Sequence, residues 1–380
     1  MHHAWVAGLG GTGGIPMWRR LIGARQSRFR PRRLALVGLF LVISVSLTLL
    51  GPTPDPSHRL RQAPNPPDEN AMELGLFVKN IYNVSLPNST FAADGWFWLL
   101  WPKSIQTVIE RDNIPITELV DLLNDVEGLR HHLEPDTAQP QLQSDGRYLQ
   151  VYRFSGTFYD ETLALKNFPF LRLDLPITIE VRPEQFKIGE QAVVLRSIQP
   201  HADTIEHALH LHGYDFRGTT VRSGLHLYGT DFGDQHVSRE DEYSQLTFEM
   251  SFKANTWAAL NAYILPWAVV MSMLLLAPNL EGGLFSQRVA IPPTVLLTFV
   301  FLQQGAHQGL PMLGYLTYLD KLYLFGYVAA AVGFCLFVWG SNQMSRAEPE
   351  QQPATIRRIN DIDRVYQLAT VCGALSILVF

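Results

Sequence analysis

The pattern of apolar and polar residues changes character near residue 257. Between residues 71 and 256, short runs alternate with a period of two and are rich in aromatic and β-branched residues, as in "YLQVYRFSGTFY", "LRLDLPITIEV" and "QLTFEMSF". Such alternation is typical of strands with one face in a core. Repeated strands separated by turn residues predict an all-β sandwich over residues 71–256. Within it, "ITELVDLLNDVEGL" has helical spacing and is expected to form a helical insert.

After residue 257 the apolar runs become long enough to cross a membrane. We expect four helices, over residues 257–277, 288–308, 318–339 and 363–380. A helix needs about 20 apolar residues to span the hydrocarbon core, so the fourth segment is short and must borrow flanking residues. The charged side chains of residues 258–340 are only Glu281, Arg288, Asp320 and Lys321. The sequence therefore predicts a four-helix transmembrane domain over residues 257–380.

The N-terminal part predicts the orientation in the membrane. Residues 1–33 hold seven Arg and no acidic residue, residues 34–51 are apolar, and residues 52–70 form a Pro-rich linker. This order is typical of a basic cytosolic segment followed by a signal peptide or signal-anchor. Because positive flanks stay in the cytosol, we expect the sandwich to be exported. The protein is then an integral protein of an inner or plasma membrane, with a periplasmic or extracellular sandwich.

Charge and cysteine content narrow the possible chemistry. Residues 54–257 carry 17 Lys and Arg against 29 Asp and Glu, a net charge of −12, so the soluble part gives no sign of nucleic-acid binding. The two cysteines, Cys335 and Cys372, lie in the apolar tail and exclude a disulfide framework in the sandwich. No hydrolase or phosphate-loop motif is present. We therefore expect no enzyme activity and no cofactor.

A cluster of histidines, "HADTIEHALHLHG", is the remaining candidate for special chemistry. His210 and His212 are spaced to share one strand face, which suits either a divalent metal or proton sensing. No cysteine or further ligand completes a tetrahedral set, and a solvent-facing loop is the plain alternative. We therefore predict no metal site, and we keep the histidines as candidates for pH sensitivity.

The second apolar segment, "QRVAIPPTVLLTFVFLQQGAHQGLP", is too polar for a helix that faces lipid on all sides. On a helix, steps of four and three place one set of residues on a single stripe. The stripe is small and polar at one end, apolar in the middle and polar at the other end: Ala290, Thr294, Leu297, Phe301, Gln304 and Gln308. Polar side chains at membrane depth usually face a bundle interior or a water-filled cavity.

Two interpretations of this stripe remain open. Several copies of the helix around an axis would enclose a pore, and Leu297 and Phe301 would form apolar rings able to gate by dewetting. Alternatively, the helix is simply packed, with Thr bonded to its own backbone and Gln at a helix interface. The segment alone does not decide between them.

Longer motifs, in the helices and in the sandwich, resemble a known family. "SQRVAIPPTVLLTFVFLQQGAHQGLPMLGYLTYLDKLYLFGYV" resembles the second and third membrane spans of pentameric ligand-gated ion channels, the Cys-loop receptor superfamily in its bacterial form. "YILP" is similar to the start of the first span and "IDRVYQLA" to the start of the fourth. In the sandwich, "GTFYDETLALKNFPFLRLDLPITIEV" and "FVKNIYNVSLPNSTFAADGWFWLLW" are similar to conserved strands of its neurotransmitter-gated channel ligand-binding domain.

The resemblance implies a fold, an assembly and an activity. It implies an immunoglobulin-like sandwich, a homopentamer in membrane lipid, and an ion channel subunit gated by a small ligand or protons. The six stripe residues would line the pore, with Leu297 at the hydrophobic gate. Aromatic residues would bind the ligand at the subunit interface: Trp96, Tyr228, Phe232 and Tyr243. A further set would couple the sandwich to the pore: Phe168, Pro169, Phe170, Lys253 and Pro311.

The sequence departs from the family pattern at several positions. The signature cysteines are missing, as in other bacterial members, and Leu171 replaces an acidic residue after "FPF". Gln287 stands where cation channels often have Glu, so the acidic sandwich is the argument left for cations as the permeant ions. Proline is tolerated in the first turn of a helix, so we expect the pore helix to start near Pro292, leaving residues 288–291 extended. That distortion supports an alternative, a non-conducting membrane receptor or assembly protein of the same architecture.

Overall fold

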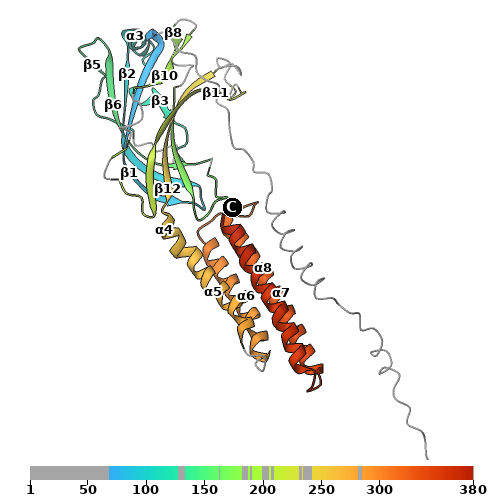
Figure 1. Cartoon of the computed structure of the whole chain (residues 1–380). Coiled ribbons are helices and arrows are strands. Elements are labelled where there is room, and N and C mark those ends of the chain that lie inside the picture. Colours follow the sequence, from blue (N-terminus) through green and yellow to red (C-terminus); the bar gives the residue numbers. More distant parts are fainter. Residues whose placement is uncertain are drawn as a thin grey trace, which may run out of the picture.

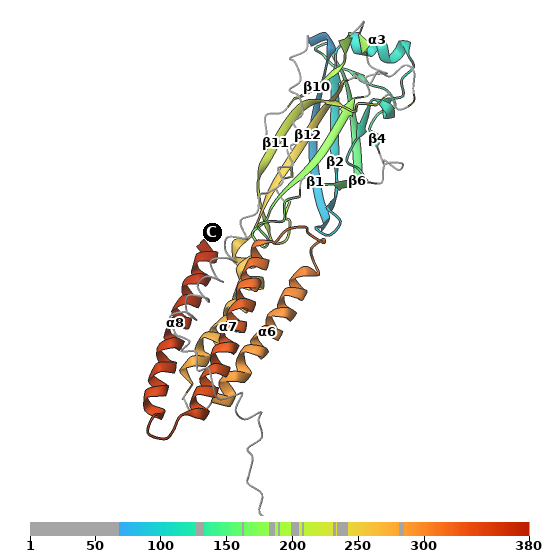
Figure 2. The same cartoon turned by 90° about the vertical axis from the view of Figure 1, so that its right-hand side faces the viewer.

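The computed structural model describes residues 68–126, 133–161, 163–181, 187–188, 191–198, 205–206, 209–230, 233, 242–280 and 285–379. A β domain made of two main sheets comes first, and a bundle of long helices follows it end to end (Figures 1 and 2). The three N-terminal segments expected before residue 68 lie outside the described residues.

The first sheet of the described chain is six-stranded and carries the N-terminal strands. Its order is β10 (Val194–Ser197), β1 (Ala71–Ser85), β2 (Thr90–Trp101), β6 (Tyr148–Tyr159) and β4 (Glu134–Pro135), with β5 (Gln141–Leu142) beside β6. β1 runs parallel to β10 and antiparallel to β2. From Ala93 onward β2 alternates, so Phe97 and Trp101 are fully buried while Trp96 and Trp98 share the other face, half-buried.

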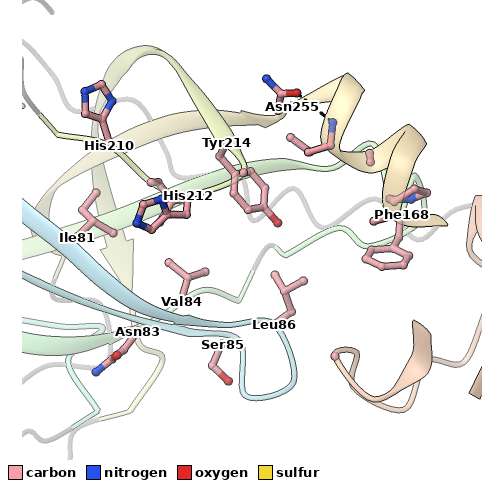
Figure 3. Close-up of a pocket in the computed structure, with 18 of the residues that line it drawn as sticks. Ile81, Asn83, Val84, Ser85, Leu86, Phe168, His210, His212, Tyr214 and Asn255 are labelled. Atoms are coloured by element: carbon pink, nitrogen blue, oxygen red, sulfur yellow. Dashed lines mark hydrogen bonds between the residues drawn. The ribbon is translucent and has the colours of Figure 1, made fainter. Parts of the chain in front are cut away.

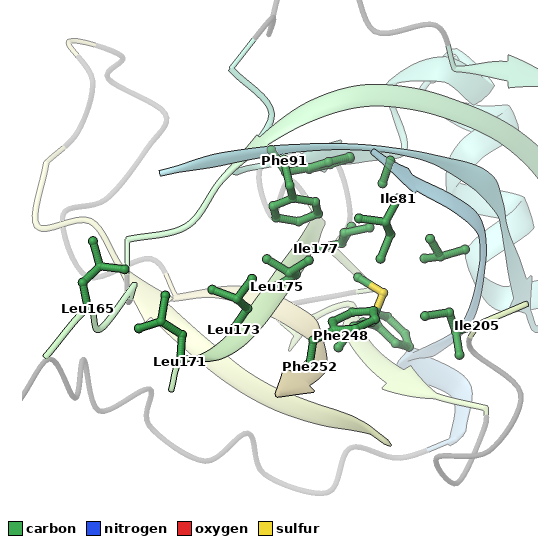
Figure 4. Packing of buried hydrophobic residues seen from close by; sticks show 14 of the residues in the cluster. Ile81, Phe91, Leu165, Leu171, Leu173, Leu175, Ile177, Ile205, Phe248 and Phe252 are labelled. Atoms are coloured by element: carbon green, nitrogen blue, oxygen red, sulfur yellow. The ribbon is translucent and has the colours of Figure 1, made fainter. Parts of the chain in front are cut away.

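The second sheet is four-stranded and lies against the first. Its order is β11 (Tyr214–Leu227), β12 (Glu242–Ala254), β7 (Arg172–Val181) and β3 (Val120–Leu122). A short hairpin pairs β8 (Lys187–Ile188) with β9 (Gln191–Ala192). Alternate residues of β7 point inward: Leu173, Leu175 and Ile177. Phe248 and Phe252 of the neighbouring strand β12 lie beside them, and Phe91 of β2 comes from the other sheet (Figure 4). The two sheets therefore enclose one apolar core, the sandwich-like domain that the alternation predicts.

The helices between the strands differ from the expected ones. α3 (Lys103–Arg111) covers one end of the domain, with Ile105, Val108 and Ile109 buried. The helical insert expected at "ITELVDLLNDVEGL" is wrong: that stretch holds a single 3-10 turn (Ile116–Glu118) followed by strand β3. β3 pairs with β7, and this edge pairing outweighs the local helical spacing.

The helical region begins directly after β12. One continuous rod, Thr256–Asn279, consists of α4 (Thr256–Ala259), a π-helical turn (Leu260–Ile264), α5 (Leu265–Leu276) and a 3-10 turn (Ala277–Asn279). It is followed by α6 (Phe285–His307), α7 (Tyr318–Arg346) and α8 (Gln352–Val379). Successive helices run in opposite directions, so α8 ends on the sandwich side of the bundle (Figure 2).

Three of the described helices are long and apolar enough to cross a membrane. They are the rod Thr256–Asn279, α6 and α7. α8 is also long, but its first half carries Arg357, Arg358, Asp361, Asp363 and Arg364. The region is therefore three membrane-capable helices plus a fourth, more polar helix, which indicates an integral membrane protein.

α6 corrects one expectation about the prolines. We expected the helix to start near Pro292, but it starts at Phe285 and passes through both Pro292 and Pro293. Each proline lacks an N–H and removes one backbone hydrogen bond from the ladder. The first turns of α6 are held instead by side chains, because Arg288 and Pro292 are both buried against neighbouring helices.

Candidate functional site

The predicted pore stripe lies on the side of α6 that no other described element covers. Each of its six residues is exposed in the single chain: Ala290, Thr294, Leu297, Phe301, Gln304 and Gln308. Leu297 is 54% and Phe301 64% exposed, whereas Val295 on the opposite side is 4% exposed. α6 thus has one face packed inside the bundle and one face left for water, lipid or a second copy of the chain.

An aromatic wedge fixes which face of α6 points outward. Phe299 is fully buried, and its ring lies 6.4 Å from the ring of Trp267 on α5 and 6.2 Å from that of Tyr323 on α7. A Cβ placed on Gly326 would lie only 2.7 Å from the Phe299 ring, so glycine gives the ring the space that it needs. Rotating α6 to bury the stripe would pull Phe299 out of this site.

The threonine hydroxyls of α6 are satisfied by the helix itself. Thr294 Oγ1 donates to the Ala290 carbonyl at 3.0 Å, and Thr298 Oγ1 donates to the Thr294 carbonyl at 2.9 Å. These bonds agree with the packed-helix interpretation as well as with a pore, since a threonine bonded in this way shows its methyl group outward. The exposure of the whole stripe, rather than its threonines, distinguishes this face.

A buried ion pair joins the foot of α6 to α8. The side chains of Arg288 and Asp363 are 2% and 6% exposed, and Arg288 Nη2 donates to Asp363 Oδ2. The guanidinium also lies 5.7 Å from the Phe285 ring and 5.0 Å from the Phe337 ring, while its Nε has no hydrogen-bond partner in the described chain. The sequence pointed to Arg288 but not to its partner, because 75 residues separate the two.

At the other end of α6, a carboxylate ties it to α7. Asp320 Oδ1 accepts from Gln303 Nε2 at 2.9 Å and lies 2.7 Å from His307 Nε2. Its Oδ2 accepts from the Thr317 backbone N–H and hydroxyl, which caps α7. The Tyr327 hydroxyl donates to the side-chain oxygen Oε1 of Gln303 and extends the network. Both ends of α6 are therefore anchored by polar side chains, and its middle by aromatic packing.

The loop that contains Phe168 and Phe170 contacts the top of the bundle. The Phe168 ring meets that of Tyr263 at 4.9 Å, and the Phe170 ring meets that of Tyr318 at 5.8 Å. The Leu319 backbone N–H donates to the Phe168 carbonyl at 3.1 Å. Pro169 stands between Phe168 and Phe170 in the sequence and is joined to Phe168 by a cis peptide bond. This loop thus links the sandwich to the starts of two helices.

The other two predicted coupling residues, Lys253 and Pro311, are less directly involved in the contact between the sandwich and the helices. Lys253 is exposed at the end of β12, and the next residue, Ala254, donates its N–H to the Leu171 carbonyl at 2.8 Å. Pro311 is half-buried in the connection between α6 and α7. In that connection Tyr315 contacts the sandwich, since its hydroxyl accepts from the Leu165 N–H at 3.2 Å.

Two of the predicted ligand-binding aromatics come together on the second sheet. The rings of Tyr228 and Tyr243 are perpendicular at 5.0 Å, and His226 lies 4.4 Å from Tyr228. The Tyr228 hydroxyl donates to the carboxylate of Glu180 at 3.1 Å, and Gln245 Nε2 donates to the same group at 2.6 Å. Burial raises the pKa of Tyr228 above its ordinary value, and the Glu180 charge adds to the rise.

Glu180 is the residue of this cluster that sequence reasoning missed. Its side chain is 4% exposed although it sits on β7, in a run of inward and outward residues that ends in three buried positions. A buried carboxylate beside two tyrosines is an electronegative, aromatic environment of the kind that favours cations. The signal available in the sequence was "ITIEV", where an acidic residue stands inside an apolar strand.

The remaining predicted ligand residues lie elsewhere. Trp96 is on β2 in the first sheet, half-buried, with Lys79 Nζ 5.6 Å from its ring centre and Phe77 at 6.3 Å. It does not join the Tyr228 cluster within the chain. Phe232 lies outside the described residues. A pocket that uses both Trp96 and Tyr228 therefore requires two copies of the chain.

The sequence was also compared with known proteins. No model of a known protein family matches the chain, and no curated protein matches it. The arrangement of the site thus rests on the geometry described above.

Proposed function

We propose that this chain is a subunit of a pentameric ligand-gated ion channel of the bacterial Cys-loop receptor type. The observation that carries the proposal is the uncovered stripe of α6, which runs from small and polar through apolar to polar. A ring of five α6 helices would place this stripe around a water-filled axis. The side chains of Leu297 and Phe301 then form the narrow apolar belt of the pore.

The sandwich supplies the sensor in this proposal. Tyr228, Tyr243 and Glu180 form one side of a pocket on the second sheet, and the neighbouring subunit contributes Trp96. A small ligand, or protons, acts at this interface. The loop that carries Phe168 and Phe170 passes the resulting motion to Tyr263 and Tyr318 at the tops of the helices.

Cations are the proposed permeant ions. The net charge of −12 over residues 54–257 is repeated in every subunit and raises the cation concentration near the pore entrance. The sandwich is proposed to lie outside an inner or plasma membrane, and the fourth helix, α8, to complete the membrane domain against lipid.

Current through the pore tests the proposal. Leu297→Thr makes the proposed gate polar and should ease its wetting, so the channel opens at rest or at a lower stimulus. Leu368→Thr is the matched control, because Leu368 is 67% exposed on α8, a helix that carries none of the proposed pore-lining residues. Wild type and both variants are compared by voltage clamp across a pH series and a panel of small amines.

The outcome separates two functions. Current at rest or at a lower stimulus in Leu297→Thr, with no such change in Leu368→Thr, would place Leu297 at a gate. Surface-expressed protein that stays silent in all three forms favours the alternative, a non-conducting receptor or assembly protein. The observation that favours this alternative is the pair of prolines inside α6.

A further inference from the structure

A cavity of about 970 Å³ lies where the sandwich meets the helices, beside the contact between Phe168 and Tyr263. Figure 3 shows it between the β1–β2 hairpin, the strand that starts at Tyr214, and the start of the first helical rod. The volume falls in the range of about 300–1,000 Å³ that is usual for small-molecule sites. The cavity is built within one chain, so it does not depend on the proposed pentamer.

The walls of this cavity, which we call the junction cavity, are mostly apolar. They come from the hairpin, from the loop that contains Phe168, from the residues just before β11 and from the rod: Ile81, Val84, Leu86, Phe168, Leu211, Ala258 and Ala262. None of the described residues that line it is Asp, Glu, Lys or Arg. The junction cavity is therefore suited to an apolar body, and its walls offer no carboxylate that would repel an anion.

Two histidines and two tyrosines are among the polar side chains that line the junction cavity. Their hydrogen-bonding groups are the imidazoles of His210 and His212 and the hydroxyls of Tyr214 and Tyr263. None of the four makes a hydrogen bond or ion pair within the described chain. In Figure 3 the side chains of His212 and Tyr214 extend into the space opposite Val84 and Leu86. His210 and His212 are exposed in the single chain and the two tyrosines are half-buried, so all four groups can be reached by a ligand.

The unused groups can all donate. A tyrosine hydroxyl donates one hydrogen bond, and an imidazole donates from at least one ring nitrogen in either protonation state. Burial raises the pKa of Tyr214 above its ordinary value, and Tyr263 adds to the rise, so the Tyr214 hydroxyl keeps its proton at neutral pH. Several donors that converge beside apolar walls match a ligand whose head is an acceptor.

We propose that the junction cavity binds a free anionic amphiphile, a carboxylate with a single apolar tail or ring. The carboxylate accepts from His212 and Tyr214, with His210 and Tyr263 as further donors. The tail lies against the hairpin and the Ala258 side of the rod. Position supports this choice, because the rod is membrane-capable and the cavity lies at its sandwich end, where amphiphiles that partition into the membrane surface arrive.

Photolabelling of the full chain tests the site. The protein is placed in nanodiscs of phosphatidylcholine and labelled with a diazirine derivative of dodecanoic acid, with dodecanoate as the competitor. Labelled peptides are mapped by mass spectrometry. We expect label on the peptides that contain residues 81–87 and 210–214, and loss of that label with excess dodecanoate. Label confined to the outer faces of the helices would overturn the proposal.

Variants and a second ligand test the recognition. Tyr214→Phe removes only a hydroxyl. It should raise about tenfold the concentration of dodecanoate that is needed to displace the label, which is the loss of affinity expected for one hydrogen bond to a charged group. Tyr159→Phe, an exposed tyrosine on β6, is the matched control and should change nothing. Methyl dodecanoate, which lacks the negative charge, should compete about tenfold less well. Equal competition by the ester, or an equal effect of both variants, would contradict the anion site.

The lipid composition of the nanodisc distinguishes two sources of the anion, a free amphiphile and a lipid headgroup. Replacing part of the phosphatidylcholine with phosphatidylglycerol offers a phosphate head at the same depth in the membrane. If the site takes a free amphiphile, the label persists in these nanodiscs and still yields to dodecanoate. Loss of the label with phosphatidylglycerol alone would assign the cavity to a lipid headgroup and overturn the free-ligand proposal.

Discussion

At the scale of single residues, Arg288 and Asp363 show how a charged pair can be placed inside an apolar bundle. Both side chains are almost fully buried, and two aromatic rings lie against the guanidinium. Burying a pair of charges costs desolvation energy, so the pair adds little stability by itself. Removing one partner destabilises the protein, because the remaining charge is left buried without compensation.

The first prediction concerns this pair. Arg288→Ala should destabilise the protein by about 3–5 kcal/mol, since it leaves the Asp363 carboxylate buried alone. Arg364→Ala, at an exposed position on α8, is the matched control and should have a small effect. The double variant Arg288→Met/Asp363→Leu should recover most of the loss. Thermal melting of the purified protein measures all three, and equal melting of the two single variants would contradict the prediction.

A second residue-scale prediction concerns Gly326. A Cβ at this position would lie 2.7 Å from the Phe299 ring, so Gly326→Ala forces the ring to shift and should cost about 1–3 kcal/mol. Gly340→Ala on the same helix is the control, because its Cβ would meet Ile359 at an ordinary 3.5 Å. Melting temperatures should fall for the first and hold for the second. If α6 turns on its axis, the current of Gly326→Ala will change as well.

At the scale of elements, α6 differs from its neighbours in being held by side chains where its backbone is weak. Pro292 and Pro293 remove two hydrogen bonds from the ladder. Arg288 anchors the helix before the prolines, and Phe299 and Asp320 anchor it after them. A helix fixed at both ends and weak between them is suited to bend at the prolines.

The third prediction follows from this weakness. Pro292→Ala/Pro293→Ala restores two backbone donors and should raise the melting temperature, because an interior proline costs about 3 kcal/mol in a helix. Pro353→Ala is the matched control, since Pro353 lies in the first turn of α8, where proline is tolerated. Hydrogen exchange at residues 288–296 should slow only in the first variant. Faster exchange there would show that the prolines stabilise α6.

At the scale of the whole molecule, the proposed pore and the proposed aromatic pocket are both built from more than one copy of the chain. Leu297 and Phe301 are large apolar side chains on an uncovered face. Trp96 lies on a different sheet from Tyr228 and Tyr243. A ring of subunits satisfies both features at once, which is why we propose a homopentamer.

The fourth prediction is the size and selectivity of that assembly. Native mass spectrometry of the full chain should give a mass close to five times 42.9 kDa, with bound lipid in addition. In channels held open by Leu297→Thr, the reversal potential should follow the cation gradient. Raising the salt concentration should weaken the selectivity, because ionic screening reduces the field of the acidic sandwiches. A monomer mass, or a potential that follows chloride, would contradict this.

The sequence by itself determined the order of the two halves. Period-two alternation indicated the sandwich, and long apolar runs indicated the helices, because each signal depends only on neighbouring residues. In "GWFWLLW", alternation with a period of two puts Trp96 and Trp98 on one face of β2 and Trp101 on the other, and in the structure Trp101 is buried while Trp96 and Trp98 are half-buried. Helix α3 is missing from the predicted elements, although its sequence "KSIQTVIER" has a clear apolar face.

Only the tertiary structure decided which distant residues meet and which faces remain uncovered. Asp363 lies 75 residues from Arg288 along the chain, and Glu180 lies 48 residues from Tyr228. Trp267 and Tyr323 lie 32 and 24 residues from Phe299, and no periodicity encodes such distances. The course of α6 through Pro292 and Pro293 likewise depends on side chains from other helices. β3 is a strand because β7 offers it an edge. Local propensity is a property of a segment, whereas burial and pairing are properties of the assembled chain.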